Sequence, residues 1–212
     1  IQYEQVDLKD GKPDLEAIQL RLDTSPVKMV YIQRSRGYSI RPSLTVADIS
    51  KIVDVVKSAS PSTVIMVDNC YGEFTEKTEP TAVGADIIAG SLIKNPGGGI
   101  APTGGYIAGK KRLIELCANR LTAPGVGKEV GATLGHSKDL FMGLFNAPHV
   151  TGEALKTAVF ASALFQRLGY EVTPGPSEKR GDIIQVIKLG GEEALIAFCR
   201  GLQSLSLIHI SE

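Results

Sequence analysis

The sequence lacks an excess of charge of either sign. Its 23 lysines and arginines balance its 23 aspartates and glutamates, so the formal net charge of the 212 residues is zero. Such a chain has no long-range field with which to attract nucleic acid or an acidic membrane surface. We therefore expect neither of these partners, and we expect small neutral or zwitterionic ligands instead.

Cysteine is scarce, and long apolar runs are missing. The three cysteines, Cys70, Cys117 and Cys199, lie far apart and form no Cys-x-x-Cys pair, which argues against a disulfide framework and a structural zinc site. No apolar run is long enough to cross a bilayer, and no basic stretch followed by an apolar segment opens the chain. These absences predict a protein of the reducing cytoplasm.

The two ends look unlike those of a natural protein. The chain begins at Ile1 without a methionine, so we expect residues upstream to have been lost. Residues 205–212 (LSLIHISE) resemble a translated sequencing-adapter read-through and are left out of the fold prediction. His209 in this tail is given no functional weight.

Alternating strand and helix patterns predict an α/β fold. Apolar stretches indicate strands at residues 2–8, 27–33, 64–67, 85–89 and 105–108. One helix is expected after Pro13, and another follows the capping-box-like segment from Thr45 to Asp48. The second helix has an apolar stripe made of Ile49, Ile52, Val53 and Val56. The nearly continuous apolar run at 64–67 is typical of a parallel strand covered on both faces.

The last third of the chain has a different pattern. Helical periodicity is weak before Phe145, and Pro148 with Gly152 predicts a break. A long helix, strands at 171–173 and 183–189, and a final helix follow. Their expected core residues are Ala161, Leu164, Phe165 and Leu168, then Leu195, Phe198, Cys199 and Leu202.

We therefore divide the chain into parts. Residues 1–146 are predicted to be the C-terminal part of a large domain with a mostly parallel sheet and flanking helices. Residues 147–204 are predicted to be a small, incomplete α+β domain, and residues 205–212 a non-native tail.

Two residues at neighbouring strand ends carry the predicted chemistry. Asp68 follows the strand at 64–67, and Lys94 lies just past the strand at 85–89. Because open α/β sheets bind ligands beyond the carboxyl ends of their strands, both side chains can open onto one cleft. A carboxylate can hold a pyridine nitrogen protonated, and a lysine can form a Schiff base with the aldehyde of pyridoxal phosphate. Burial beside a cationic ring would lower the pKa of the lysine.

Each of these residues also has an ordinary explanation. A single loop lysine is usually a solvated surface charge, and a strand-end aspartate commonly caps local amides. The Ser91 hydroxyl can bind a phosphate, and Gly97, Gly98 and Gly99 permit close approach of the backbone, although turn flexibility explains the glycines equally well. A Gly-x-Gly-x-x-Gly pattern at a strand-to-helix turn is absent.

Longer motifs around these residues carry a family resemblance. DNCYGEF (68–74), GADI (84–87) and SLIKNPGGG (91–99) resemble fold-type I pyridoxal-phosphate enzymes of cysteine and methionine metabolism. Within that group they are most similar to the methionine gamma-lyase-like family, also called aluminium resistance proteins. The similarity covers nearly all of residues 1–204.

The resemblance implies a function and a set of site residues. It implies a pyridoxal-phosphate-dependent carbon-sulfur lyase that acts on a sulfur-containing amino acid and works as a homo-oligomer, with this chain as a truncated and inactive piece. Lys94 is then the Schiff-base lysine, Asp68 the pyridine partner and Ser91 a phosphate ligand. Asn69 and Tyr71 are predicted as further cofactor contacts, and no metal is expected.

Two departures from the broader group affect the site. Ile93 stands where that group has a threonine, and residues 33–38 (QRSRGY) replace its Ser-x-Asn-Pro element. An arginine in this region can meet a phosphate or a substrate carboxylate. Arg34, Arg36 and Arg41 are equally well explained as surface residues.

Three other classes of function stay open. A different pyridoxal-phosphate enzyme, such as an aldolase or aminotransferase, would keep Lys94 and Asp68 but release no thiol. A dinucleotide-binding oxidoreductase would use the loop from Gly97 to Gly105 and would not need Lys94. A non-enzymatic binding or metal-tolerance role would survive the loss of the lysine.

Overall fold

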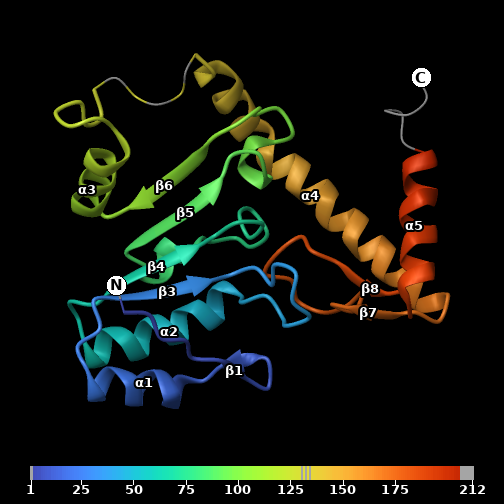
Figure 1. The fold of residues 1–212 in the computed structure, drawn as a ribbon, viewed down its shortest axis with the longest axis horizontal. Helices are drawn as coiled ribbons and strands as arrows, with labels where there is room; N and C mark the ends of the chain where they lie inside the picture. The colour runs from blue at the N-terminus through green and yellow to red at the C-terminus, as the bar shows by residue number, and fades with distance from the viewer. Residues whose placement is uncertain (1, 130, 132, 134, 206–212) are drawn as a thin grey trace.

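A four-stranded sheet lies at the centre of the chain. The structure is a computed structural model that describes all residues except 1, 130, 132, 134 and 206–212, so most of the predicted tail and its His209 lie outside the described residues. The strands are β3 (Met29–Gln33), β4 (Val64–Asp68), β5 (Ile87–Ser91) and β6 (Gly105–Gly109), in that order across the sheet (Figure 1). The first three strands are parallel, and β6 runs antiparallel to β5. The predicted mixed α/β fold is confirmed.

Helix α2 (Val46–Ala59) begins as the sequence predicts. The Thr45 side chain accepts the backbone N–H of Asp48, and the Asp48 carboxylate accepts the backbone N–H of Thr45, which completes a capping box. The predicted apolar stripe is buried against β3 and β4, where it meets Ile32, Ile65 and Val67. Helices α1 (Leu15–Thr24) and α2 lie together on one side of the sheet (Figure 1).

The opposite face of the sheet is open, so the expectation of a strand covered on both faces is wrong for this chain. Along β4, Ile65 and Val67 are buried, while their neighbours are only half-buried. On the adjoining β3, Met29 and Tyr31 are 49% and 51% exposed. Side chains alternate between faces along a strand, so the second face of β3 and β4 is less buried than the face that meets α2.

The N-terminal segment forms less structure than predicted. A strand was expected over residues 2–8, but only β1 (Leu8–Lys9) pairs, in a short antiparallel ladder with β2 (Lys12–Pro13). Residues 2–7 are exposed and have no regular structure. Apolar residues alone do not make a strand when no neighbouring strand offers hydrogen bonds. Helix α1 then begins after Asp14, whose carboxylate caps the N–H of Ala17.

Helix α4 (Ser137–Arg167) runs without interruption through Pro148 and Gly152. The predicted break is therefore wrong, and the predicted domain boundary at 146/147 falls inside this helix. The helix contacts the short 3-10 helix η2 (Asn95–Gly97) near its start and strand β7 (Glu171–Thr173) further along. Tertiary packing at both places holds the segment helical, because neighbouring elements can offset the backbone hydrogen bond that proline removes.

The C-terminal elements are small and partly exposed. Strands β7 (Glu171–Thr173) and β8 (Val186–Lys188) form an antiparallel pair, and α5 (Glu192–Ser204) follows Gly191. The predicted core spacing of α5 is realised only in part: the half-buried Phe198 packs edge-to-face on Phe165 of α4, whereas Leu195 and Leu202 are 53% and 57% exposed. Leu164 and Leu168 at the end of α4 are exposed as well. The remaining elements are α3 (Lys111–Leu121), which follows β6, and the 3-10 helix η1 (Pro80–Val83).

Candidate active site

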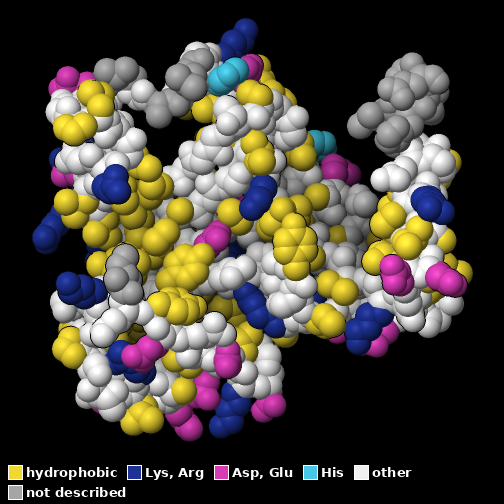
Figure 2. Space-filling model, viewed as in Figure 1, with side chains coloured by type: hydrophobic (Ala, Val, Ile, Leu, Met, Phe, Trp, Pro, Cys, Tyr) yellow, Lys and Arg dark blue, Asp and Glu magenta, His cyan; other side chains and the backbone are white. Residues whose placement is uncertain are grey.

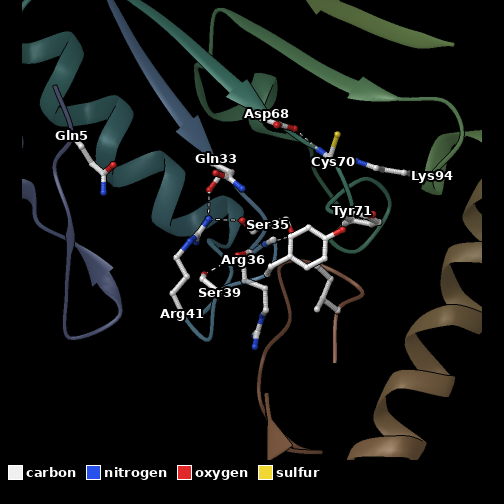
Figure 3. A pocket seen from close by; sticks show the side chains of 13 residues that line it. Gln5, Gln33, Ser35, Arg36, Ser39, Arg41, Asp68, Cys70, Tyr71 and Lys94 are labelled. Atoms are coloured by element: carbon white, nitrogen blue, oxygen red, sulfur yellow. Dashed lines mark hydrogen bonds between the residues drawn. The ribbon is translucent and has the colours of Figure 1, made fainter. Parts of the chain in front are cut away.

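The carboxyl ends of the three parallel strands converge on one cavity. Gln33 ends β3 and pairs with Asp68 at the end of β4, which in turn pairs with Ala89 in β5. A cavity of about 650 Å³ opens there, between these strand ends and the loop that follows β3. Asp68 and Lys94 both line it (Figure 3). The parallel order therefore brings the two predicted catalytic residues to one site, as ligand sites in open α/β sheets require.

Asp68 is held by two hydrogen bonds. Its Oδ1 accepts the backbone N–H of Cys70 at 3.1 Å, and its Oδ2 accepts the hydroxyl of Tyr31 at 3.2 Å. The local capping that is typical of strand-end aspartates is thus present, together with exposure to the cavity. Burial, followed by the charge of Asp68, raises the pKa of Tyr31 to about 12.

Tyr31 was not identified from the sequence, although strand register gives the signal. Tyr31 pairs with Met66, two residues before the pair formed by Gln33 and Asp68. Residues two apart lie on the same face of a strand, so Tyr31 shares a face with the aspartate. Knowing that β3 and β4 are adjacent would have been enough to find it.

Lys94 lies in the turn between β5 and η2, above an aromatic ring. Its Nζ is 4.3 Å from the centroid of the Tyr71 ring, within range of a cation–π interaction. Tyr71 has a φ of +65°, a left-handed conformation that costs energy for a residue other than glycine. Its carbonyl accepts the N–H of Ile183 at 3.2 Å. Figure 3 shows Lys94 pointing toward Cys70, with Asp68 on the other side of the thiol.

The pKa of Lys94 is shifted upward, against the expectation. Burial by itself lowers the pKa of the ammonium group, but Cys70, Tyr71 and Asp68 raise it by more. The pKa of the Cys70 thiol is also raised, first by burial and then by its hydrogen bond with Asp68. The expected depression fails because the groups that the chain itself places around the amine are anionic when ionised rather than cationic.

The structure shows which of the three arginines line the cavity, a question that the sequence left open. Arg34 is fully buried, and its guanidinium donates to Asn69 at 2.7 Å and to Glu76 at 2.9 Å. It fastens the loop after β4 and does not line the cavity. Arg36 and Arg41 do line it.

These two arginines are held mainly by backbone carbonyls. Arg41 donates to the carbonyls of Gln33 and Ser35 (Figure 3). Arg36 donates to the carbonyl of Thr173 at 3.1 Å, and its buried Nε lies 3.9 Å from Asp182 without a hydrogen-bond partner among the described residues. Arg36 is only 3% exposed and lies beside the buried carboxylate of Asp182, so Lys94 and Arg41 are the more accessible cations of the cavity.

Two predicted cofactor contacts lie elsewhere. The Asn69 side chain is fully buried, where it accepts from Arg34 and donates to Glu79 at 2.9 Å and to Tyr106 at 3.2 Å. Ser91 ends β5 opposite Gly105 and lines neither this cavity nor a second, smaller one beside it. Their assignment as cofactor ligands stays a prediction.

Of the three glycines after Lys94, Gly98 makes room for a helix, whereas a Cβ on Gly97 would meet the backbone of Leu92 and one on Gly99 would meet nothing within 4 Å. A Cβ on Gly98 would lie 2.3 Å from the carbonyl oxygen of Gly143 in α4, and a Cβ on Gly143 would lie 2.2 Å from that of Gly97. The expected close approach of backbone is present, but its partner is α4. The helix and the turn that carries Lys94 are therefore packed backbone to backbone.

A buried acid, Glu73, lies beneath the site, five residues after Asp68 in the DNCYGEF motif. Glu73 is 3% exposed, accepts the Tyr106 hydroxyl at 2.8 Å, and has a second carboxyl oxygen without a described partner. Its backbone carbonyl accepts the side-chain amide of Asn95, the residue after Lys94, at 3.0 Å. Burial raises the pKa of Glu73 to about 7.

The sheet and its cavity define a class of protein: a mixed α/β fold that presents a lysine amine and an aspartate carboxylate at the ends of adjacent parallel strands. The chain belongs to the methionine gamma-lyase family, which it matches over residues 1–211.

Two solved structures are similar over nearly all of the chain. One, from Clostridium acetobutylicum, is provisionally described as a cystathionine beta-lyase involved in aluminium resistance. It is 50% identical, with a TM-score of 0.93 over 97% of this chain and 49% of that one. The other, from Clostridium novyi, is described as a carbon-sulfur lyase involved in aluminium resistance. It is 51% identical, with a TM-score of 0.92 and the same coverage.

A more distant structure shares the fold alone. Cystathionine gamma synthase from Xanthomonas oryzae is 20% identical, with a TM-score of 0.65 over 92% of this chain and 51% of that one. The chain also spans 50% and 65% of two uncharacterised curated relatives, from Bacillus subtilis and Lactobacillus delbrueckii, to which it is 46% and 51% identical.

No helix among the described residues is long and apolar enough to cross a membrane. The same residues contain no group of three or more histidine, cysteine, aspartate or glutamate side chains that could hold a metal ion.

Proposed function

We propose that the protein is a pyridoxal-phosphate-dependent lyase that breaks a carbon-sulfur bond in a sulfur-containing amino acid. The proposal rests on one observation above all: Lys94 and Asp68, from consecutive parallel strands, line the same cavity. Family membership and the carbon-sulfur lyase description of the Clostridium novyi structure support it.

The groups around the cavity fit this cofactor chemically. Pyridoxal phosphate carries an aldehyde, a basic ring nitrogen and a phosphate. The cavity offers a primary amine in Lys94, a carboxylate in Asp68 and the guanidinium group of Arg41. Its volume of about 650 Å³ lies in the range of small-molecule sites, which is about 300–1,000 Å³.

The residues have distinct tasks in this proposal. When bound, pyridoxal phosphate supplies an electron-withdrawing ring that stabilises negative charge at the substrate α-carbon. Lys94 would hold the cofactor through Nζ and, as a free amine, would take the proton from the substrate α-carbon. Asp68 would hold a proton on the ring nitrogen, and the hydrogen bonds that it accepts from Cys70 and Tyr31 fix the orientation of its carboxylate.

The overall reaction releases a thiol and, after addition of water, a keto acid and ammonia. The proton that Lys94 takes from the α-carbon would end on the leaving sulfur, so the residue is unchanged at the end of the cycle. The positive charge of Arg41 in the cavity favours the anionic ends of cofactor and substrate. Whether sulfur leaves from the β or the γ carbon is an outcome of the substrate test below.

We further propose a homo-oligomer in the cytoplasm. Hydrophobic side chains are exposed over α3, the sheet and α5 on the face shown in Figure 2. On α4, Phe141 and Phe145 are exposed as well. Exposed apolar patches commonly mark protein–protein contacts. Sedimentation at increasing protein concentration tests this, and a monomer at all concentrations would contradict it.

Cofactor capture is the first test of the lyase proposal. The purified chain is mixed with pyridoxal phosphate, reduced with borohydride and digested, and mass spectrometry locates the added mass. We expect it on the peptide that contains Lys94, together with a visible absorption band before reduction. Lys94→Ala should lose both, whereas the exposed Lys110→Ala should retain them. Capture at other lysines only would overturn the proposal.

The pH dependence of capture is a second readout. A lysine reacts with an aldehyde only in its neutral form, and the raised pKa of Lys94 keeps that form scarce at neutral pH. The initial rate of capture should therefore rise about tenfold per pH unit up to at least pH 9. A rate that is independent of pH would show that a different group reacts.

Thiol release identifies the reaction. The chain is completed with the rest of a full-length relative and is given cystathionine, cysteine or methionine. Thiol should appear from at least one of them, and Lys94→Ala should lower the rate by about 10²–10⁴-fold. Asp68→Asn keeps the shape but removes the charge, and it should slow turnover while leaving the captured cofactor in place. Capture without thiol release would favour an aldolase or aminotransferase.

A further inference from the structure

A buried hydrogen bond joins the turn that carries Lys94 to the loop that follows Asp68. The side-chain amide of Asn95, the residue after Lys94, donates to the backbone carbonyl of Glu73 at 3.0 Å. Asn95 is 6% exposed, so the bond is shielded from water. Glu73 lies in the loop after β4, which ends at Asp68. The bond therefore fastens together the segments that present the proposed amine and the proposed carboxylate.

The acceptor of this bond is held firmly in place. The loop after β4 packs on the buried side chain of Arg34, and a Cβ on Gly72 would lie 2.5 Å from the Cδ of Arg34. Before and after Glu73, Tyr71 and Phe74 have φ angles of +65° and +61°. Such left-handed conformations cost energy for residues other than glycine and persist where the surrounding structure fixes them. The Glu73 carbonyl is thus a fixed point for the Lys94 turn.

The turn itself holds Lys94 less firmly. The backbone N–H of Lys94 donates to the carbonyl of Ser91 at 3.4 Å, beyond the usual N–H···O range of about 2.7–3.2 Å. The contact with α4 lies at Gly98, four residues further along the chain. Asn95 directly follows Lys94, so its bond to Glu73 acts on the lysine through a single peptide unit.

We propose that Asn95 is a positioning residue that sets the separation between the Lys94 amine and the Asp68 carboxylate. The inference rests on the proposed function, in which one ligand reaches both groups. Without the amide, the buried Glu73 carbonyl would lose its donor, and the turn must move to let water reach it. A misplacement of about 1 Å can cost about 10²-fold in rate, so even a small movement of the turn is costly.

The first experiment tests the hydrogen bond in the unaltered chain without cofactor. Nuclear magnetic resonance follows the exchange of side-chain amide protons with solvent. The amide of Asn95 should exchange at least about tenfold more slowly than that of Asn119, which is exposed on α3. Equal exchange rates would show that the bond is absent and would overturn the proposal.

The second experiment compares two aldehydes at Lys94. Pyridoxal phosphate has to reach both Lys94 and Asp68, whereas propanal meets the amine alone. Each is trapped with borohydride, and mass spectrometry gives the rate at the Lys94 peptide. Asn95→Leu nearly keeps the shape of the side chain, adds no charge and removes the donor. It should reduce the preference for pyridoxal phosphate over propanal by about tenfold or more.

The matched control for this comparison is Asn119→Leu. Asn119 lies on α3, which follows β6, and β6 ends opposite Ile87 at the far end of β5 from the Lys94 turn. This variant should keep the preference of the parent. Asn95→Ala is tested beside Asn95→Leu, and cooperative unfolding in urea shows that each variant is folded. An unchanged preference in the folded Asn95 variants, or an equal loss with both aldehydes, would contradict a positioning role.

The third experiment separates positioning from binding in the protein completed with the rest of a full-length relative. Asn95→Leu should lower kcat for thiol release by about 10–10²-fold and leave KM within about threefold, because the amide acts on the position of the lysine. A raised KM with an unchanged kcat would show that Asn95 binds the substrate instead, and would overturn the proposal.

The positioning role and the lyase proposal fail in different ways. If the parent chain captures no cofactor at Lys94, the lyase proposal fails and takes the positioning role with it. If the parent captures cofactor at Lys94 and the Asn95 variants keep its preference, the lyase proposal stands and the positioning role alone fails.

Discussion

Helices α2 and α5 have similar sequence patterns and opposite surroundings. Both place four apolar or thiol side chains at helical spacing. In α2, Ile49 and Val56 are fully buried beneath the sheet. In α5, Leu195 and Leu202 are more than half exposed. Periodicity therefore tells which face of a helix is apolar, and a second element decides whether that face is buried.

The first prediction compares a fully buried residue of α2 with an exposed residue of α5. Ile49→Ala should lower the free energy of unfolding by about 3 to 4 kcal/mol, because it removes buried methyl groups and leaves a cavity. Leu202→Ala in α5 removes a similar side chain from an exposed site and should change it by less than about 0.5 kcal/mol. Urea denaturation followed by circular dichroism measures both. Similar losses would mean that the α5 face is covered in solution.

The second prediction compares two glycines within α4. Alanine is the better helix former, so Gly152→Ala, where a Cβ meets nothing within 4 Å, should stabilise the chain by about 0.5–1 kcal/mol. Gly143→Ala places a Cβ against the carbonyl of Gly97 and should instead destabilise it by about 2 to 3 kcal/mol. The midpoints of urea unfolding give the sign. Stabilisation by both would show that α4 does not rest on the Lys94 turn.

The third prediction compares a buried acid with an exposed one. The pKa of Glu73 is raised from 4.5 to about 7, so the folded chain keeps a proton there that the unfolded chain releases. Stability should therefore fall as the pH rises from about 4.5 to 7 and level off above that. Glu73→Gln should remove this loss and be more stable than the parent by on the order of 2 kcal/mol at pH 8, with little difference at pH 4.

The control for Glu73 is an acid on α5. Glu193 is exposed in the first turn of that helix. The stability difference between Glu193→Gln and the parent should stay nearly constant from pH 4.5 to pH 8. A flat difference for Glu73→Gln as well would indicate that the buried carboxyl stays ionised at every pH tested.

The fourth prediction concerns the N-termini of α2 and α5 and has the smallest expected effect on stability. Thr45→Ala removes half of the capping box of α2 and should cost about 1 kcal/mol. Helix α5 has Gly191 at the same position, with no side-chain cap and an extended φ of 174°. Gly191→Asp should therefore add a few tenths of a kcal/mol. Melting temperatures resolve both changes. A lower melting temperature for Gly191→Asp would contradict the assigned start of α5.

The presence of Asp68 and Lys94 in one cavity was predictable because it depends on strand order alone. Both follow apolar strands, and parallel neighbours end at the same edge of a sheet. Strand order does not predict which arginines line the cavity. Arg34 and Arg36 are two residues apart, yet Arg34 turns to the loop after β4 and Arg36 to Thr173, because segments distant in the sequence supply their partners.

The role of the glycines after Lys94 could not be predicted from the sequence either. Three in a row indicate close approach of something, but the sequence does not say whether that is a phosphate or a helix. The answer comes from Gly143, more than forty residues later, whose backbone lies against Gly97. The predicted break at Pro148 failed for a related reason, since packing at both ends of α4 outweighs the local cost of proline.

The sequence by itself determined the parallel α/β order, the capped start of α2 and the two strand-end residues that line one cavity, because these follow from backbone geometry and local hydrogen bonding. Only the tertiary structure decided which apolar faces are buried, which arginines line the cavity and why the Lys94 turn is rich in glycine. Those features depend on contacts between segments far apart along the chain, and such contacts leave no local signal in the sequence.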